Sequence, residues 1–185
     1  VVIDIRRINP ALTVRAYGKI GRDEKGEFLL STLRENGVDI SGMKQSETLG
    51  TSFTQVMSAA GGERTFFTYA GASAFFGYGD IPFEKITAKI FHLGYFLLLE
   101  QVDNGDGVKI LRELKKRGIK TSIDLVSSAA GGYEKVLPCL PYVDYLIINE
   151  LEAAALCGAK DTENLRNLAE KLKTKGVRES VIIHK

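Results

Sequence analysis

The chain of 185 residues contains 44% hydrophobic and 26% charged residues, a balance typical of a globular protein and not of a disordered one. Its 25 Lys and Arg residues nearly balance its 23 Asp and Glu residues, which leaves a formal net charge of +2. Such a small surplus, without a basic block, does not indicate a nucleic-acid-binding surface. The length fits one domain with a sizeable core, or at most two small ones, at about 150 residues per domain.

The cysteines and the apolar runs indicate a compartment. Cys139 and Cys157 match no metal-ligand spacing and no disulfide framework, so we interpret them as reduced structural thiols. The longest apolar run, residues 95–99, is far too short to cross a membrane, and the first residues do not read as a signal segment. We therefore expect a cytoplasmic protein that contacts no membrane.

Both ends of the sequence read as interior parts of a longer chain. The sequence opens on Val1 without an initiator Met and closes on an apolar run at residues 181–183, which is typical of a buried strand. A parallel strand normally leads into a further connection. We therefore expect the 185 residues to be a fragment.

The first half of the chain predicts a strand, a turn, a helix and a hairpin. Residues 13–17 alternate as a short strand, and a glycine-rich turn at 18–26 follows. The next helix is expected to place Phe28, Leu29 and Leu33 on its apolar side and to stop at Asn36 and Gly37. The β-rich runs at residues 52–58 and 65–69 flank a short glycine-containing connection, which predicts a β-hairpin.

The second half of the chain alternates between strand and helix patterns. The sequence predicts helices over residues 108–117 and 162–175, closed by Gly118 and Gly176. Four apolar runs are predicted as strands, at residues 90–94, 119–123, 143–148 and 181–183. Strands separated by crossover segments favour a parallel sheet with helices on its faces, and thus an α/β fold.

Polar residues follow several of these strands. In such sheets ligands bind beyond the carboxyl ends of the strands, where the sequence places His92, Asp124, Asn149 with Glu152, and His184. Simpler interpretations stay open for each of the first four. Asn149 and Glu152 match a helix N-cap and its capping-box partner, Asp124 could cap the next segment, and a lone imidazole on an apolar strand is more often a satisfied rim residue.

Two further segments carry weak motifs. The glycines of residues 18–26 match neither the dinucleotide fingerprint nor the phosphate loop, so this segment alone indicates only a tight strand-to-helix turn. Residues 103–107 look like a calcium loop but lack its alternating ligands and distal Glu. A turn at a helix start is the better interpretation.

Taken in order, the motifs resemble those of the ribokinase-like (PfkB) sugar kinases. Residues 17–26 contain the Gly-x-x-Gly-x-Asp-x-x-Gly core of the first signature of that family, and Gly37-Val38-Asp39 follows the next helix. Residues 51–54 and 61–65 resemble its lid hairpin, residues 69–73 resemble the Gly-Ala-Ser segment after it, and residues 149–152 resemble its Asn-x-x-Glu motif. Residues 1–8 are similar to the first helix of the family, although alone they could pass for a strand.

The resemblance implies a fold and an activity. The fold would be a three-layer, mostly parallel Rossmann-like sheet with a small β lid. Residues 1–185 would form a single, incomplete domain of this kind, with lid strands drawn from about residues 12–18 and 50–70. The activity would be transfer of the ATP γ-phosphoryl group to a primary hydroxyl of a sugar or nucleoside.

The resemblance also assigns site residues. Asn149 and Glu152 would hold Mg²⁺ and its waters near the phosphates of ATP, with Asp124 close by, because a hard cation prefers oxygen ligands and keeps several waters. His184 would lie near the nucleotide, where members of the family often carry Thr. Thr51, Phe53, Tyr69 and His92 would contact the substrate or form the lid, although aromatic hairpin residues more often serve packing.

Three alternatives remain at this stage. The resemblance places the catalytic Asp in a motif downstream of Lys185, so no residue of the chain is assigned as general base and we expect the fragment itself to be inactive. A non-catalytic sugar- or nucleotide-binding relative with the same fold is the second candidate, and a dinucleotide-binding oxidoreductase is a distant third. Exposed lid strands offer edges that pair between subunits, so a homodimer through the lid is also expected.

Overall fold

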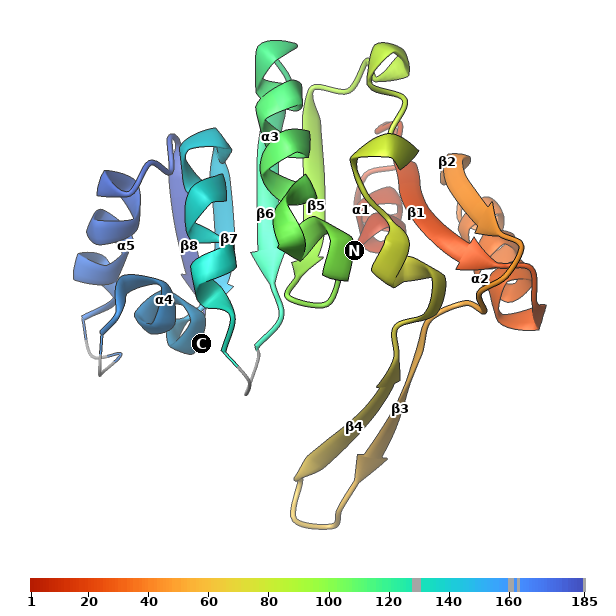
Figure 1. Ribbon diagram of the computed structural model, residues 1–185, viewed down its shortest axis with the longest axis horizontal. Coiled ribbons are helices and arrows are strands. Elements are labelled where there is room, and N and C mark those ends of the chain that lie inside the picture. The colour runs from red at the N-terminus through yellow and green to blue at the C-terminus, as the bar shows by residue number, and fades with distance from the viewer. Residues whose placement is uncertain (128–130, 160–161, 163, 185) are drawn as a thin grey trace. The chain divides into compact units, whose positions relative to one another are not determined.

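The computed structural model describes residues 1–127, 131–159, 162 and 164–184. The chain divides into two compact units, Val1–Ile81 and Pro82–Lys185, and each is described by itself. Together they give an α/β fold with mostly parallel strands and a small antiparallel hairpin (Figure 1), which confirms the predicted fold class.

Unit 1 begins with a helix and a parallel pair of strands. Helix α1 (Val2–Ile8) precedes strand β1 (Arg15–Gly21), and helix α2 (Glu24–Glu35) connects β1 to strand β2 (Asp39–Ser46). The two strands pair in parallel. Their core is a small cluster of buried Ala16, Leu33 and Val38. Val2 and Ile3 of α1 are partly buried against this cluster. Residues 2–8 thus form a helix, as the family resemblance implied, and not a strand.

The structure corrects two expectations for this region. Strand β1 runs on to Gly21, so the first part of the predicted turn at 18–26 is strand. Helix α2 buries Gly26, Leu30 and Leu33, whereas Phe28 is 72% and Leu29 37% exposed. The predicted apolar side is therefore confirmed for Leu33 and wrong for Phe28 and Leu29. Its predicted stop is confirmed, because Asn36 is the C-cap and Gly37 follows in the left-handed region with φ 70°.

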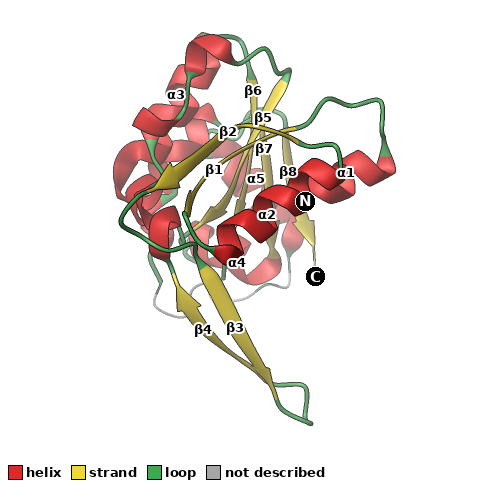
Figure 2. Cartoon of the chain, turned by 90° about the vertical axis from the view of Figure 1, so that its right-hand side faces the viewer, coloured by secondary structure: helices red, strands yellow, loops and turns green. Residues whose placement is uncertain are grey.

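The predicted hairpin is confirmed. Strand β3 (Phe53–Ser58) pairs antiparallel with β4 (Arg64–Tyr69), with Phe53 opposite Tyr69. Every residue of both strands is exposed, so the hairpin is a ribbon with two solvent-facing surfaces (Figure 2). It forms a sheet of its own, while β1, which covers part of the predicted lid segment at 12–18, pairs with β2. The turns η1 (Gly71–Phe75) and η2 (Tyr78–Asp80) close the unit.

Unit 2 is built on a four-stranded parallel sheet. Its strands β5 (Ile90–Phe96), β6 (Lys120–Leu125), β7 (Tyr145–Asn149) and β8 (Ser180–His184) are ordered as in the sequence. All neighbouring pairs are parallel. The four predicted strands are thereby confirmed.

Helices and short turns connect these strands. Helices α3 (Gly107–Lys116) and α5 (Leu165–Thr174) confirm the two predicted ones, and α4 (Glu150–Cys157) follows β7 directly. The remaining connections contain η3 (Phe83–Lys85), η5 (Tyr133–Lys135), η6 (Leu137–Tyr142) and the π-helical turn η4 (Val102–Asp106).

The core of unit 2 lies between the sheet and its helices. Ile123 and Leu146 of the sheet, Leu111 and Leu114 of α3, and Leu172 of α5 are all 0% exposed. Burying a side chain of this size contributes about 1.5–3 kcal/mol. This core holds the strand ends in register, and the polar residues that follow the strands are placed by it.

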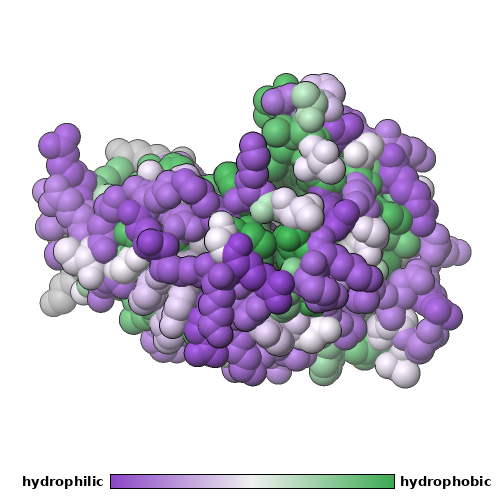
Figure 3. All heavy atoms as spheres, turned by 90° about the horizontal axis from the view of Figure 1, so that it is seen from above, coloured by the Kyte–Doolittle hydropathy of each residue, from purple (hydrophilic) through white to green (hydrophobic). Residues whose placement is uncertain are grey.

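The surface carries both hydrophilic and hydrophobic side chains. Hydrophilic side chains cover much of the face seen from above (Figure 3). Within the part of the chain that the structure describes, no helix combines the length and apolar character needed to cross a membrane.

Candidate functional site

The carboxyl ends of β6, β7 and β8 bring predicted site residues to one edge of the sheet. The strands are parallel, and their register places Asp124 opposite Ile147 and Asn149 opposite His184. Polar groups after parallel strands meet at such an edge because all strand ends point the same way. Asn149, Glu152 and His184 therefore share this edge with Asp124, as the sequence predicted.

A hydrogen-bonded network joins Asn149, Glu152 and Ser127. The Asn149 side chain accepts a bond from the Glu152 backbone N–H at 2.9 Å, and the Glu152 Oε2 atom accepts one from the Asn149 backbone N–H at 3.1 Å. This is the capping box of α4. In addition, the Ser127 hydroxyl donates to Glu152 Oε1 at 2.9 Å and accepts from Asn149 Nδ2 at 2.9 Å. The cap is therefore one part of a larger polar network.

Burial gives the Glu152 carboxylate a defined environment. The residue is 3% exposed, and its two oxygens receive bonds from the Asn149 amide and the Ser127 hydroxyl. The N-terminus of α4 adds a favourable dipole for the negative charge. Each carboxylate oxygen can accept a second bond, so the group keeps acceptor capacity in a fixed orientation.

The donor set determines what kind of cation could be held here. Amide and carboxylate oxygens are hard ligands, but the nearly complete burial of Glu152 fits an ion held through its waters better than one bound directly. In the described segments, no group of three or more His, Cys, Asp and Glu side chains is arranged to hold a metal ion.

Asp124 belongs to a second polar group, at the end of β5. His92 Nε2 lies 3.2 Å from Asp124 Oδ2, and His92 Nδ1 lies 3.1 Å from the Ser122 hydroxyl. The Tyr95 backbone N–H donates to Asp124 Oδ1 at 2.6 Å. Burial raises the pKa of the Asp124 carboxyl, but the bonds from His92 and Tyr95 outweigh it and leave that pKa below its usual value. Asp124 is thus a carboxylate at neutral pH.

Both nitrogens of His92 are engaged within unit 2. In the neutral ring, Nε2–H donates to Asp124 and Nδ1 accepts the Ser122 hydroxyl. This geometry matches a satisfied rim histidine, one of the two interpretations that the sequence left open. His92 here orients Asp124.

The backbone beside Asp124 is strained. Tyr95 and Leu97 both have positive φ, 64° and 76°, which costs a residue with a side chain about 1–2 kcal/mol. Each is held by a carboxylate: the Tyr95 N–H by Asp124, and the Leu97 N–H by Asp103 at 2.8 Å. Strain of this kind persists where surrounding bonds enforce it and is concentrated at functional sites. No sequence pattern predicts this strain.

Residues 103–107, which look like a calcium loop in the sequence, have a structural role. Asp103 is buried, and its burial raises the pKa of its carboxyl. Asp106 accepts bonds from Lys109 and Gln101, and Gly105 has φ 117°. The segment forms the turn that begins α3, as the sequence favoured.

The predicted lid residues have different environments. Thr51 is 5% exposed, and its hydroxyl donates to Asp23 at 2.6 Å and accepts from the Gly21 N–H at 2.9 Å. Phe53 and Tyr69 are 45% and 44% exposed, and their ring centroids are 5.8 Å apart. Lys25 Nζ lies 5.0 Å from the Phe53 ring centroid. Thr51 is an anchor at the base of the hairpin, and the aromatic pair is the accessible part.

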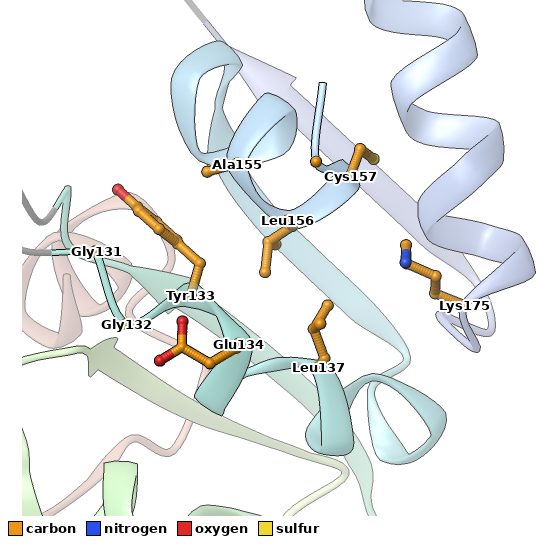
Figure 4. A pocket seen from close by; sticks show the side chains of 10 residues that line it. Gly131, Gly132, Tyr133, Glu134, Leu137, Ala155, Leu156, Cys157 and Lys175 are labelled. Atoms are coloured by element: carbon orange, nitrogen blue, oxygen red, sulfur yellow. The ribbon is translucent and has the colours of Figure 1, made fainter. Parts of the chain in front are cut away.

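A hollow of about 400 Å³ lies at the other end of α4 (Figure 4). Leu137 and Leu156 project into it, and Glu134 and Lys175 contribute opposite charges to its walls. Burial raises the pKa of the Cys157 thiol on its wall, so this thiol is protonated at neutral pH. Only Cys157, interpreted as a structural thiol, was singled out in the sequence, because three separate segments of the chain form the hollow.

Ser127 is the polar residue that the sequence reasoning missed in the Glu152 network. It lies two residues beyond β6, at the same edge as Asn149. Its position after a strand that carries Asp124 was the available signal. His184, in contrast, was predicted and is exposed at the end of β8.

Comparisons with known proteins identify the family of this chain. Residues 11–185 match the pfkB family carbohydrate kinases. A ribokinase of Schizosaccharomyces pombe is 29% identical over 183 residues, covering 96% of this chain and 56% of the relative. Fructokinase-1 of Oryza sativa subsp. japonica is 29% identical over 156 residues, covering 80% and 48%.

Solved structures show the same fold. The fructokinase from Xylella fastidiosa with bound ATP superposes with a TM-score of 0.74 at 20% identity, covering 98% of this chain and 60% of that one. The chain spans about half the length of the curated relatives it matches. With a family match over nearly its whole length, the chain belongs to the pfkB family of carbohydrate kinases.

Proposed function

We propose that the whole protein is an ATP-dependent phosphotransferase that acts on a primary hydroxyl of a sugar or nucleoside. Family membership supports the reaction class, and the similarity to a ribokinase and a fructokinase supports a sugar acceptor. The observation that carries the proposal is the Ser127–Asn149–Glu152 network at the carboxyl edge of the sheet.

In this proposal the network binds the metal and the phosphates. Mg²⁺, when bound, would neutralise phosphate charge and polarise the transferring group. Glu152 and Asn149 would hold the ion through its waters, since the buried carboxylate keeps acceptor capacity and a fixed orientation. Ser127 would keep the Glu152 carboxylate and the Asn149 amide aligned.

The remaining predicted residues receive supporting roles. Asp124, held by His92 and the Tyr95 backbone N–H, would add negative charge near the site. This charge would favour ATP that carries Mg²⁺ over ATP without the ion. His184, exposed at the end of β8, would contact the nucleotide. Phe53 and Tyr69 of the hairpin would cover the sugar and exclude water.

A homodimer through the hairpin is part of the proposal. Both faces of β3 and β4 are exposed and carry large apolar side chains. Two isolated strands are marginally stable in water, so a second copy that covers one face would stabilise the ribbon.

A second candidate is a non-catalytic relative that binds a sugar or nucleotide. It is favoured by the nearly complete burial of the Glu152 side chain, 3% exposed, which limits the access of an ion to its carboxylate. Both candidates predict ligand binding, and only the first predicts turnover.

The test uses the whole protein with a panel of sugars and nucleosides. Melting temperature is measured with each ligand, with and without ATP and Mg²⁺, since a ligand of the native state raises it by mass action. ATP-dependent phosphorylation is then measured for every ligand that binds. Turnover of a bound sugar supports the kinase, and binding without turnover supports the second candidate. If no ligand binds and none is phosphorylated, both candidates are rejected.

A further inference from the structure

The glycine motif at residues 18–26 surrounds Thr51 at the base of the hairpin. The Asp23 carboxylate accepts three bonds: the Thr51 hydroxyl at 2.6 Å, the Thr51 backbone N–H at 2.7 Å and the Gly26 N–H at 2.8 Å. The Thr51 hydroxyl in turn accepts the Gly21 N–H at 2.9 Å. Gly21, Asp23 and Gly26 of the motif therefore all lie around Thr51.

Close backbone approach explains why two of these positions are glycine. A Cβ on Gly21 would lie 2.6 Å from the Leu49 carbonyl oxygen and from the Thr51 nitrogen. A Cβ on Gly26 would lie 2.9 Å from the Thr51 hydroxyl oxygen. Neither glycine has the positive φ that favours this residue. The motif thus makes room for the chain that enters the hairpin, and conformational freedom of the turn is not its purpose.

The chain that leaves the hairpin is tied to the same place. The Ala72 N–H donates to the Gly50 carbonyl at 2.9 Å, and the Ser52 and Ser73 hydroxyls lie 2.9 Å apart. Gly71 has φ 50°, and a Cβ there would meet the Gly50 carbonyl oxygen. Both legs of the hairpin are therefore fixed within a few residues of Thr51, while the hairpin beyond them is fully exposed.

We infer that Asp23 and Thr51 form a latch that fixes the direction of the β3–β4 hairpin relative to α2 and β1. Asp23 is a positioning residue: it acts through Thr51 and contacts no substrate. The three bonds lower the pKa of Asp23 to about 2, so the latch is charged and closed at every physiological pH. The consequence for substrate rests on the proposed function, in which the hairpin covers the sugar.

The direct test is a distance distribution between spin labels within unit 1. Labels are attached to cysteines placed at Gly61, near the hairpin tip, and at Glu35, an exposed residue at the end of α2. Cys157 is replaced by Ser, and Cys139, 1% exposed, is shielded from the label. Pulsed electron resonance then reports how widely the hairpin samples directions.

Two variants open the latch and two keep it. Asp23→Asn retains an oxygen for the helix cap but places its amide N–H against the Thr51 backbone N–H, which is also a donor. Thr51→Val removes the hydroxyl and keeps the size of the side chain. Thr51→Ser keeps both hydroxyl bonds, and Glu24→Gln removes a neighbouring charge from the same helix start. We expect the distribution to widen at least twofold in the first two and to stay as in the parent in the last two.

Several results would overturn the latch. Parent-like widths in Asp23→Asn and Thr51→Val would do so, and so would equal widening in Glu24→Gln, since charge alone would then explain the effect. If Asp23→Asn does not fold, Thr51→Val decides, because it breaks the same junction from the other side.

Kinetics of the whole protein separate this inference from the proposed function. An opened latch is expected to raise KM for the sugar about tenfold, as loss of a bond to a charged group would, with a smaller effect on kcat. Widened distances in a protein without turnover would leave the latch standing and reject the kinase. Widened distances with unchanged KM would reject a role of the latch in substrate binding.

Discussion

Replacing Glu152 separates its structural role from its proposed chemical one. Glu152→Ala would leave the partly buried Asn149 N–H without its acceptor, whereas the exposed Ser127 hydroxyl could turn to water. A buried polar group that loses its partner costs about 1–3 kcal/mol. We therefore expect the free energy of unfolding to fall by about 1–3 kcal/mol in the alanine variant.

Glu152→Gln is expected to behave differently. Gln also serves in a capping box, so its oxygen can accept the Asn149 N–H while its amide donates to the Ser127 hydroxyl, which accepts in place of donating. The remaining loss is the charge at the start of α4, worth about 0.3–1 kcal/mol. The fold should therefore survive, whereas a carboxylate that holds Mg²⁺ would be gone.

The assay pairs urea unfolding with activity of the whole protein at varied Mg²⁺ concentration. Glu152→Gln should unfold within about 1 kcal/mol of the parent and require far more Mg²⁺, with activity reduced at least tenfold. Glu150→Gln, which removes a charge from the same helical turn outside the network, is the matched control. Unchanged Mg²⁺ dependence in Glu152→Gln would refute the metal role, and parent-like stability of Glu152→Ala would refute the network.

Three further expectations concern unit 1. The pKa of Asp23 is lowered from 3.8 to about 2 in the folded protein. The Asp23 carboxylate therefore contributes fully to the free energy of unfolding above its unfolded pKa, and this contribution is lost as the pH falls toward 2. In Asp23→Asn the free energy of unfolding should depend less on pH between these two values. Gly71→Ala should lower the unfolding free energy by about 1–2 kcal/mol or more because φ is positive and a carbonyl oxygen blocks the Cβ, while Gly61→Ala, with open space around it, should not. Phe66→Lys should abolish dimers in sedimentation, whereas Thr65→Lys, on the opposite face that carries Phe53 and Tyr69, should not; a monomeric parent would dispose of the dimer.

The sheet of unit 2 could be predicted because its signals are local. Its strands are apolar runs, and Gly118 and Gly176, both with positive φ, end the segments after α3 and α5. Burial on both faces of a parallel strand imposes such runs. The polar residues at its carboxyl edge followed from the same rule, because strand direction alone determines which ends meet.

Unit 1 was harder to predict because its strands are short and partly exposed. Strand β2 (Asp39–Ser46) was not predicted, since only Gly42 of its residues is buried and its sequence has no apolar run. The apolar side of helix α2 was predicted only in part, because Leu30 packs inward beside Leu33, and the exposed Phe28 does not. A sheet of two strands offers a helix only a small surface to pack against, so few apolar residues of the helix are needed and their spacing is a weak signal.

Tertiary contacts account for the rest. Ser127 and Thr51 each complete a network with residues more than 20 positions away, and no local pattern encodes such a partner. Thr51 was predicted to contact the substrate or form the lid, and no local pattern indicated that its hydroxyl bonds are made at the base of the hairpin. The strained φ angles of Tyr95 and Leu97 likewise depend on Asp124 and Asp103.

The helix cap and the proposed metal role of Asn149 and Glu152 are not competing explanations. A capping box fixes both side chains in one rotamer, because each accepts the backbone N–H of the other, and Ser127 removes the remaining freedom of the carboxylate. A metal site built on such a cap needs no further ordering when the ion arrives. The bond that stabilises α4 would then also preorganise the ligand. A substitution that frees the carboxylate without touching its charge, such as Ser127→Ala, should therefore raise the Mg²⁺ concentration needed for activity and lower the free energy of unfolding together.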